Sequence, residues 1–213
     1  MTTRNNSTVR RMSAEYRRVL LLKAAEDLFF ENGYAATSLN AILERAGGSK
    51  RNFYTEFGGK EGLFKLLVTE CTERSLARHN LAKKADQTLE EALTTSAQLI
   101  LKLFLEPTST KLYRITFIDG PKFPELVNIF MKYGPSRAIN HLEALLISYQ
   151  EKSEIPETID CHRAAGHFVA MLRGNLLYEV AMNVRKPPGS EELEIFCHSV
   201  VNVFLHGILG RRQ

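Results

Sequence analysis

Basic and hydrogen-bonding side chains gather in one short stretch near residue 50. Within six residues the sequence places Lys50, Arg51, Asn52, Tyr54 and Thr55. Arginine and asparagine can make paired hydrogen bonds to the edge of a base, and lysine and tyrosine can bind phosphate oxygens. Phe53 and Phe57 are one helical turn apart, so a helix here would bury both rings and turn Arg51 away from them. The pattern predicts a short helix that enters the major groove of DNA.

A second short helix is expected just before this one. Its apolar face has the i, i+3, i+4, i+7 spacing of an amphipathic helix and consists of Leu39, Ile42, Leu43 and Ala46. Thr37 or Ser38 can cap its start, because a side-chain oxygen accepts a free backbone N–H there. The glycine pair 47–48 permits a sharp reversal, after which Ser49 can cap the reading helix. This arrangement is typical of a helix-turn-helix, although a helical hairpin within an ordinary core is the alternative.

The order of these parts identifies a family. A helix containing AAEDLFFENGY precedes the pair and FGGKEGLF follows it, so the chain resembles the N-terminal domain of TetR-family bacterial transcriptional regulators from about Ala14 to Val68. The resemblance implies that Lys50 and Arg51 lie near bases and that Asn52, Tyr54 and Lys60 hold phosphates. The full predicted DNA-binding set is Thr37, Ser38, Lys50, Arg51, Asn52, Tyr54, Thr55 and Lys60.

Three positions depart from the family pattern. Gly48 stands where the family usually has Val, and Gly59 stands where it often has Ser or Asn. Glu56 occupies a position where a His or Arg often touches phosphate, so no such contact is expected there.

Composition and charge fit a globular DNA-binding protein. The chain has 213 residues, of which 44% are hydrophobic and 24% charged, and no apolar run approaches the ~18 residues of a membrane helix. No secretory signal is visible, so the cytoplasm is the expected location. Residues 1–65 contain 11 Lys and Arg against 7 Asp and Glu, whereas residues 66–213 contain 17 of each. The excess positive charge thus accompanies the helix-turn-helix, although a chance cluster of so small an excess remains an alternative.

The remaining sequence is helical in pattern, with no strand alternation. We expect an all-α fold of about nine helices, with a three-helix DNA-binding domain at 13–65 and a larger dimerisation and effector domain at 66–213. The segments LYRITFIDGPKFPELVNIF and FVAMLRGNLL also resemble the C-terminal part of AefR-like members of the family.

Small residues at a spacing of four suggest a close helix contact near the C-terminus. Gly166, Ala170 and Gly174 share one face of a helix expected over 159–184. In the TetR family the last two helices of each subunit form a four-helix dimer interface, which would here also take Phe196, Val200 and Phe204. A homodimer bound to a near-palindromic operator is therefore expected. Packing of the same residues within one subunit is the alternative.

Aromatic and sulfur-containing side chains mix with polar groups in the middle helices. The resemblance implies a pocket there for a small apolar or amphipathic effector, lined by Phe104, Tyr113, Arg114, Phe117, Phe168, Met171, Asn175 and Tyr178. An ordinary hydrophobic core is the alternative interpretation of the same residues.

Catalysis has little support in the sequence. The only adjacent Cys/His pairs are Cys161-His162 and Cys197-His198. Neither pair can chelate a metal or form a catalytic dyad by itself, because neighbouring helical residues point about 100° apart. Motifs for zinc proteases, nucleophilic hydrolases and nucleotide binding are missing, and no cofactor or metal is expected. A zinc site built by distant residues and a helical adaptor protein remain alternatives. We therefore predict a DNA-binding transcriptional regulator, a repressor released by an effector, with an effector-independent protein or an activator as the alternative.

Overall fold

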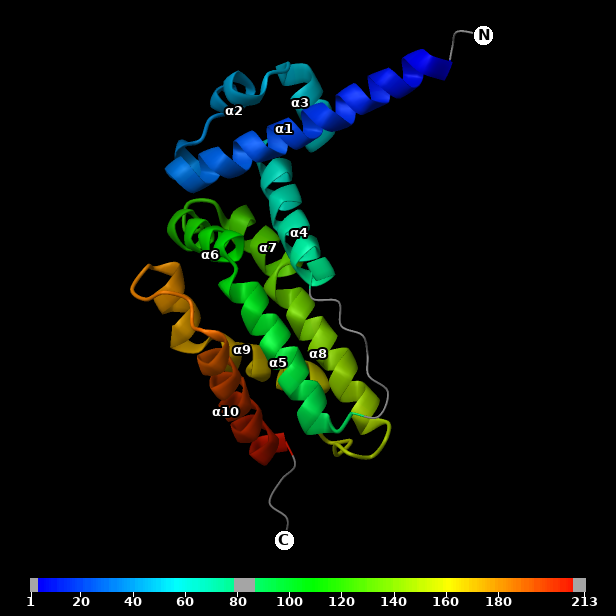
Figure 1. The fold of residues 1–213 in the computed structure, drawn as a ribbon, viewed down its shortest axis with the longest axis vertical. Coiled ribbons are helices and arrows are strands. Elements are labelled where there is room, and N and C mark those ends of the chain that lie inside the picture. The colour runs from blue at the N-terminus through cyan, green and yellow to red at the C-terminus, as the bar shows by residue number, and fades with distance from the viewer. Residues whose placement is uncertain (1–3, 79–86, 209–213) are drawn as a thin grey trace. The chain divides into compact units, whose positions relative to one another are not determined.

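The chain folds into helices joined by short connections. The computed structural model describes the backbone of residues 4–78 and 87–208, and the side chains of 15–73 and 87–206. Within these ranges it contains ten helices and no strand (Figure 1). They are α1 (Arg4–Ala36), α2 (Leu39–Ala46), α3 (Lys50–Phe57), α4 (Lys60–Arg78), α5 (Leu89–Leu105), α6 (Pro107–Asp119), α7 (Pro124–Tyr133), α8 (Pro135–Gln150), α9 (Cys161–Ala181) and α10 (Ser190–Ile208).

The predicted all-α fold with about nine helices is confirmed. α7 and α8 are separate helices, because Gly134 has non-helical dihedrals (φ −111°, ψ −100°) and Pro135 begins a new helix. Of the helices in the described ranges, none combines the length and the apolar character needed to cross a membrane.

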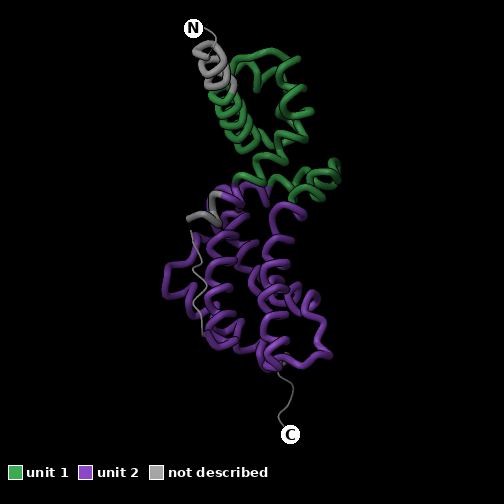
Figure 2. Tube along the Cα trace, turned by 90° about the vertical axis from the view of Figure 1, so that its right-hand side faces the viewer, with its two compact units in different colours: residues 1–70, 115–130 green, residues 71–114, 131–213 purple. Residues whose placement is uncertain are grey.

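The residues group into two compact units (Figure 2). The first comprises residues 1–70 together with 115–130, and the second comprises 71–114 together with 131–213. The predicted division at 65/66 differs from this grouping in two ways. The first boundary lies inside α4, and the end of α6 and most of α7 join the first unit. The second difference depends on contacts between residues far apart in the sequence, which local patterns do not report.

The first unit has an aromatic core. Phe29 of α1, Phe53 of α3 and Phe64 of α4 are all completely buried. The Phe29 and Phe64 rings meet edge to face, with centroids 6.1 Å apart. This ring contact joins α1 to α4 within the first unit.

The second unit is a helical bundle in which α9 packs on α5, α8 and α10. α5 begins with a capping box, in which Thr88 accepts the Glu91 N–H and Glu91 accepts the Thr88 N–H. Phe168 of α9 is completely buried and meets Phe204 of α10 with ring centroids 4.7 Å apart. Phe168 therefore belongs to the core of the bundle.

Replacing Phe168 with Ala should consequently destabilise the bundle by about 3–5 kcal/mol, because a large cavity would replace a fully buried ring. Phe117→Ala is the matched control: its ring is 58% exposed, so we expect a change of about 1 kcal/mol or less. Urea denaturation of both variants measures the difference. Equal losses for the two variants would show that Phe168 is not part of a tightly packed core.

Gly174 interrupts α9 rather than lining a regular helical face. Its dihedrals are φ 40° and ψ −153°, in a region that favours glycine. A Cβ built on Gly174 would lie 3.8 Å from the Phe196 ring, so the space there is sufficient and the backbone is the constraint. The predicted stripe of Gly166, Ala170 and Gly174 is therefore wrong in its third member, which marks a kink.

Candidate DNA-binding site

Local capping builds the helix-turn-helix as predicted. Ser38 precedes α2 and accepts the Ala41 N–H at 3.1 Å, and Ser49 precedes α3 and accepts the Asn52 N–H at 3.3 Å. Between them Gly47 adopts φ 75° and donates its N–H to the Leu43 carbonyl at 2.8 Å. Each of these bonds satisfies a helix-end group that would otherwise lack a partner, so the two helices end where the sequence indicates.

One side of α3 is buried and the opposite side is exposed. Phe53 and Phe57 are 0% and 8% exposed, and their rings contact each other at 5.1 Å. The opposite side presents the predicted reading residues, all exposed: Lys50, Arg51, Asn52, Tyr54 and Thr55. Among the described residues no ion pair or hydrogen bond engages the side chains of Lys50 and Arg51. Their charged groups are therefore available to a polyanion.

Thr55 is the reading residue with an internal bond. Its hydroxyl donates to the Arg51 carbonyl at 2.9 Å, as a threonine inside a helix often does. The oxygen keeps a lone pair, so towards DNA Thr55 can accept a hydrogen bond or offer its methyl group to thymine.

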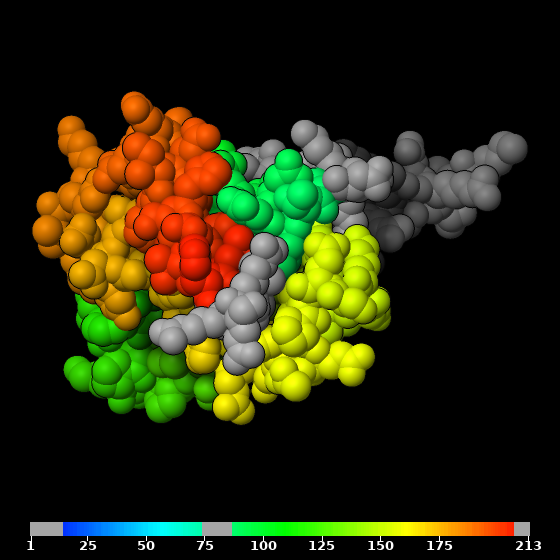
Figure 3. Space-filling model, turned by 90° about the horizontal axis from the view of Figure 1, so that it is seen from below, coloured from blue at the N-terminus to red at the C-terminus, as the bar shows by residue number. Residues whose placement is uncertain are grey.

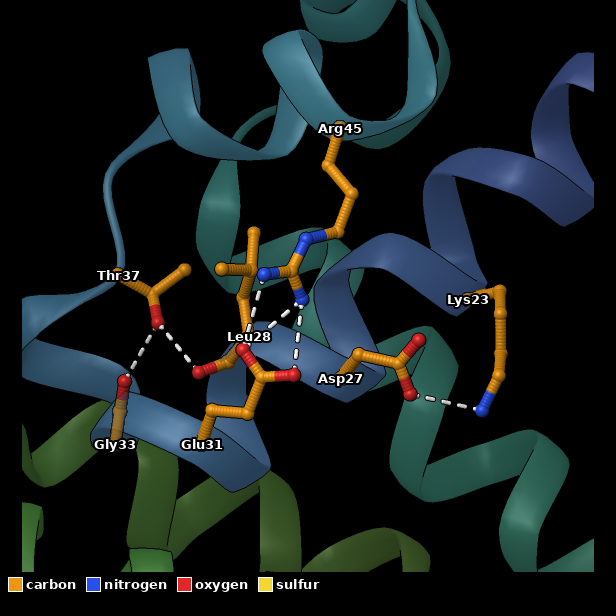
Figure 4. Close-up of polar contacts among 7 residues, drawn as sticks. All are labelled: Lys23, Asp27, Leu28, Glu31, Gly33, Thr37 and Arg45. Carbon is orange, nitrogen blue, oxygen red and sulfur yellow. Dashed lines mark hydrogen bonds and ion pairs between the residues drawn. The ribbon is translucent and has the colours of Figure 1, made fainter.

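Ion pairs on the surface of the first unit fix α2 and α3 against α1. Arg45 of α2 binds both carboxylate oxygens of Glu31 at 3.0–3.1 Å (Figure 4). Glu56 of α3 lies 3.9 Å from Arg18 of α1, with no phosphate role expected for it. Each pair is exposed, so it contributes at most about 1 kcal/mol but restricts how the helices turn.

Thr37 was predicted to contact DNA, and the structure corrects this. The residue is 2% exposed, and its single hydroxyl proton is shared between the carbonyls of Gly33 at 2.7 Å and Leu28 at 3.1 Å (Figure 4). Its side chain therefore binds the end of α1 and cannot reach a ligand. Ser38, the other candidate on this turn, is exposed and remains a predicted DNA contact.

Lys60 at the start of α4 is directed into the first unit. Its ammonium donates to the carbonyls of Tyr34 at 2.8 Å and Thr37 at 3.0 Å, and it lies 4.1 Å from the centre of the Tyr34 ring. Burial lowers the pKa of Lys60, while the Asp119 carboxylate opposes this shift. Two of the three ammonium donors are used internally, so the predicted phosphate contact can draw only on the third.

The predicted effector residues lie in different environments within the described part of the chain. Phe168 is core, Asn175 and Tyr178 are exposed on α9, and Phe117 is exposed in the first unit. Phe104 and Met171 pack against the core of the second unit. A hydrophobic pattern locates a helix face without showing whether that face meets the core or an empty space, so this set of effector residues stays a prediction.

Two neighbouring residues of the predicted set hold the end of α9. The guanidinium of Arg114 donates to the Ala181 carbonyl at 2.7 Å and to the Asn183 side-chain oxygen at 2.9 Å. Tyr113 meets Tyr178 with ring centroids 5.8 Å apart, and burial is the main cause of its raised pKa. These contacts fix the part of α9 that follows the kink at Gly174.

A cavity of about 370 Å³ opens between α9 and α10 in the second unit. Its lining contains both apolar and polar residues and consists of Thr158, Ile159, Asp160, Arg163, Ala164, His167, Met171, Val203 and Phe204. Of the predicted effector residues only Met171 is among them. Such a volume accommodates a small ligand.

The surface of α10 differs from the predicted dimer face. Val200 and Phe204 are 7% and 6% exposed, so they already pack within their own subunit. Ile195 and Val203 are instead 64% and 60% exposed. Ile195 and Val203 belong to a stripe one position away from the predicted one, and the packing of the bundle turns that stripe outward.

In the view of Figure 3, atoms of α10 lie at the surface of the second unit. On the adjacent α9, Ala170 is exposed, and a Cβ built on Gly166 would meet nothing within 4 Å. Both helices therefore present small or apolar residues to the outside of the second unit. A surface of this kind suits association with another protein surface.

Comparisons with known proteins match both parts of the chain. Residues 21–67 match the model of the bacterial regulatory proteins of the tetR family, and residues 91–207 match the C-terminal domain of AefR-like transcriptional repressors. The transcriptional repressor ComR of Escherichia coli K12 is 26% identical over 157 residues, which cover 72% of this chain and 74% of ComR.

Solved structures of TetR-family and related regulators share the fold of this chain. The flavonoid-responsive regulator FrrA is 31% identical, with a TM-score of 0.76 over 92% of this chain and 98% of FrrA. A TetR-family regulator from Pseudomonas syringae pv. tomato DC3000 shares the fold with a TM-score of 0.68 at 21% identity, over 88% of this chain and 94% of that one.

Proposed function

Because the chain belongs to the TetR family of DNA-binding transcriptional regulators, we propose that it acts as a homodimer whose two α3 helices read a near-palindromic operator. The main observation behind this proposal is that α3 buries Phe53 and Phe57 on one side and exposes its basic and polar side chains on the other. Lys50 and Arg51 would contact bases, and Asn52 and Tyr54 would bind phosphates. TetR-family regulators bind DNA as dimers, and half-sites about one DNA turn apart, or a multiple of it, would suit two such helices.

The proposed partner surface is the outer face of α9 and α10. Ile195 and Val203 supply exposed apolar contacts on α10, and Gly166 and Ala170 allow a close approach to α9. Two copies of this face can meet across a twofold axis, because an isologous interface uses the same patch twice. This face would bury apolar side chains that a single subunit leaves in water.

Selection from a random library of duplex oligonucleotides tests DNA recognition directly. We expect the parent protein to enrich duplexes that contain two related half-sites in inverted orientation, and one such sequence then serves as the selected duplex in the experiments below. Recovery of DNA without a shared sequence would contradict sequence-specific recognition.

Repression relieved by a small molecule is the proposed mode of regulation. The match to AefR-like repressors and the similarity to ComR support the repressor part. The relative FrrA is named as flavonoid-responsive, which makes planar polyphenols the first compounds to test. A ligand can release DNA only if it prefers the conformation that does not bind the operator, since equal affinity for both states shifts nothing.

Thermal-shift screening followed by DNA titration measures this coupling. A flavonoid that raises the melting temperature is expected to weaken binding to the selected duplex. A compound that stabilises the protein but leaves DNA affinity unchanged would contradict the coupling. If no compound binds, an effector-independent regulator becomes the better account.

A further inference from the structure

The link between α1 and α2 is held by a carboxylate from a distant part of the chain. Gly33 departs from helical geometry with φ 82° and ψ 169°, just before the last residues of α1. The next two backbone N–H groups, of Tyr34 and Ala35, both donate to Oδ2 of Asp119 at 2.8 and 3.2 Å. Asp119 ends α6 and is 9% exposed, so its carboxylate is a buried acceptor for both of the backbone donors that follow the kink.

Two other side chains hold the carbonyl groups of the same link. Lys60 donates to the carbonyls of Tyr34 and Thr37, and Thr37 donates to the carbonyl of Gly33. Both belong to the helix-turn-helix region of the sequence, whereas Asp119 is separated from Tyr34 by 85 positions. Asp119 is thus the member of this network that comes from outside the DNA-binding segment.

Packing around Tyr34 reinforces the same attachment. The Tyr34 ring is 3% exposed and meets Phe123, four residues after Asp119, with centroids 5.3 Å apart. It also meets Phe29 at 5.3 Å and Phe64 at 5.6 Å. The segment 119–123 therefore contacts the link twice: the Asp119 carboxylate accepts from its backbone N–H groups, and the Phe123 ring packs on the Tyr34 ring.

We infer that Asp119 is a positioning residue for the reading helix. The link at 33–37 leads directly into Ser38, which caps α2, and α2 carries the turn that begins α3. Holding the link fixes where α2 starts, and so fixes the direction in which α3 presents Arg51. This inference rests on the proposed DNA-binding function.

The space around Gly33 supports a close and specific fit. A Cβ built on Gly33 would lie 3.2 Å from Oδ2 of Asp119, and φ 82° is unfavourable for any residue with a side chain. Gly33→Ala would therefore disturb the contact between the link and Asp119 while leaving the carboxylate itself in place.

Binding to the selected duplex tests the inference. Asp119→Ala should bind about ten-fold more weakly or worse at a temperature where it is fully folded, because one buried and one partly buried N–H group lose a charged acceptor. Asp119→Asn keeps an oxygen at the same place and should recover most of the affinity. Glu91→Ala is the matched control, since it removes a carboxylate that accepts a backbone N–H in the second unit, and it should bind like the parent.

Amide hydrogen exchange distinguishes positioning from a general loss of stability. In Asp119→Ala the amides of Tyr34 and Ala35 should exchange faster, while those of α9 keep their protection. Affinity within two-fold of the parent, or unchanged exchange at both amides, would overturn the inference. So would an equal loss of affinity in Glu91→Ala. If Asp119→Ala does not fold, Gly33→Ala and Asp119→Asn carry the test, and parent-like affinity in Gly33→Ala would overturn it.

Failure of the proposed function has a different signature. A parent protein that selects no DNA would contradict DNA recognition, whereas the exchange of Tyr34 and Ala35 still reports whether Asp119 holds the link.

Discussion

Arg51→Ala is expected to weaken binding to the selected duplex by about 1–3 kcal/mol for each half-site and to relax the preference at one base pair in each. Arg51 is exposed on α3, opposite the buried rings of Phe53 and Phe57. Among the described residues no internal partner competes for its guanidinium, so the full paired contact to a guanine is available. Fluorescence anisotropy with the selected duplex and with single base-pair variants measures both effects.

Tyr54→Phe is the control for this substitution. It removes a hydroxyl from a side chain that is 56% exposed on the same helix, and it leaves the ring that meets Phe53. Because a phosphate contact carries no sequence information, all duplexes should be weakened alike. An Arg51→Ala protein that binds the selected duplex and its variants like the parent would show that Arg51 does not read bases.

Val203→Arg is expected to prevent dimerisation and to lower affinity for the selected duplex by about a hundred-fold or more. Two linked reading helices bind far more tightly than one, since the second contact is made at a high effective concentration. Val203 is 60% exposed on α10, and across a twofold axis the substitution places two positive charges at an apolar interface. Sedimentation velocity and DNA titration together measure the outcome.

Ile147→Arg is the matched control for the interface. It adds the same charge at an apolar residue of α8 that is 40% exposed, and it should leave a dimer with parent-like affinity. A parent that is monomeric at micromolar concentration, or a Val203→Arg protein that still dimerises, would contradict the proposed face. Gly174→Leu is less informative, because φ 40° strains the backbone whether or not a partner is bound.

Local chemistry explains why the helix-turn-helix could be predicted from the sequence. The caps at Ser38 and Ser49 and the glycine turn at Gly47 depend on residues within four positions of one another. The spacing of Phe53 and Phe57 then decides which side of α3 is exposed. No long-range information is needed for either result.

Other features depend on how the helices pack, which a local sequence pattern does not report. Thr37 has the right chemistry for a cap or a phosphate, but its hydroxyl is taken by carbonyls of α1. In the sequence, Asp119 is recognisable only as the last residue of a helix. Its bond to the Tyr34 N–H, 85 positions away, depends on the tertiary fold. The exposed stripe of α10 was missed because Val200 and Phe204 are as apolar as Ile195 and Val203, and the packing of the bundle decides which pair faces outward.

Methylation interference on the selected duplex tests the central claim, that a pair of α3 helices reads the major groove. Methylation of guanine N7 places a methyl group where an arginine would bind, so it should block the contact directly. We expect interference at guanines in two inverted half-sites, with centres about one helical turn apart or a multiple of it, and its loss at one guanine per half-site in Arg51→Ala. Binding that is insensitive to N7 methylation throughout the duplex would contradict the account.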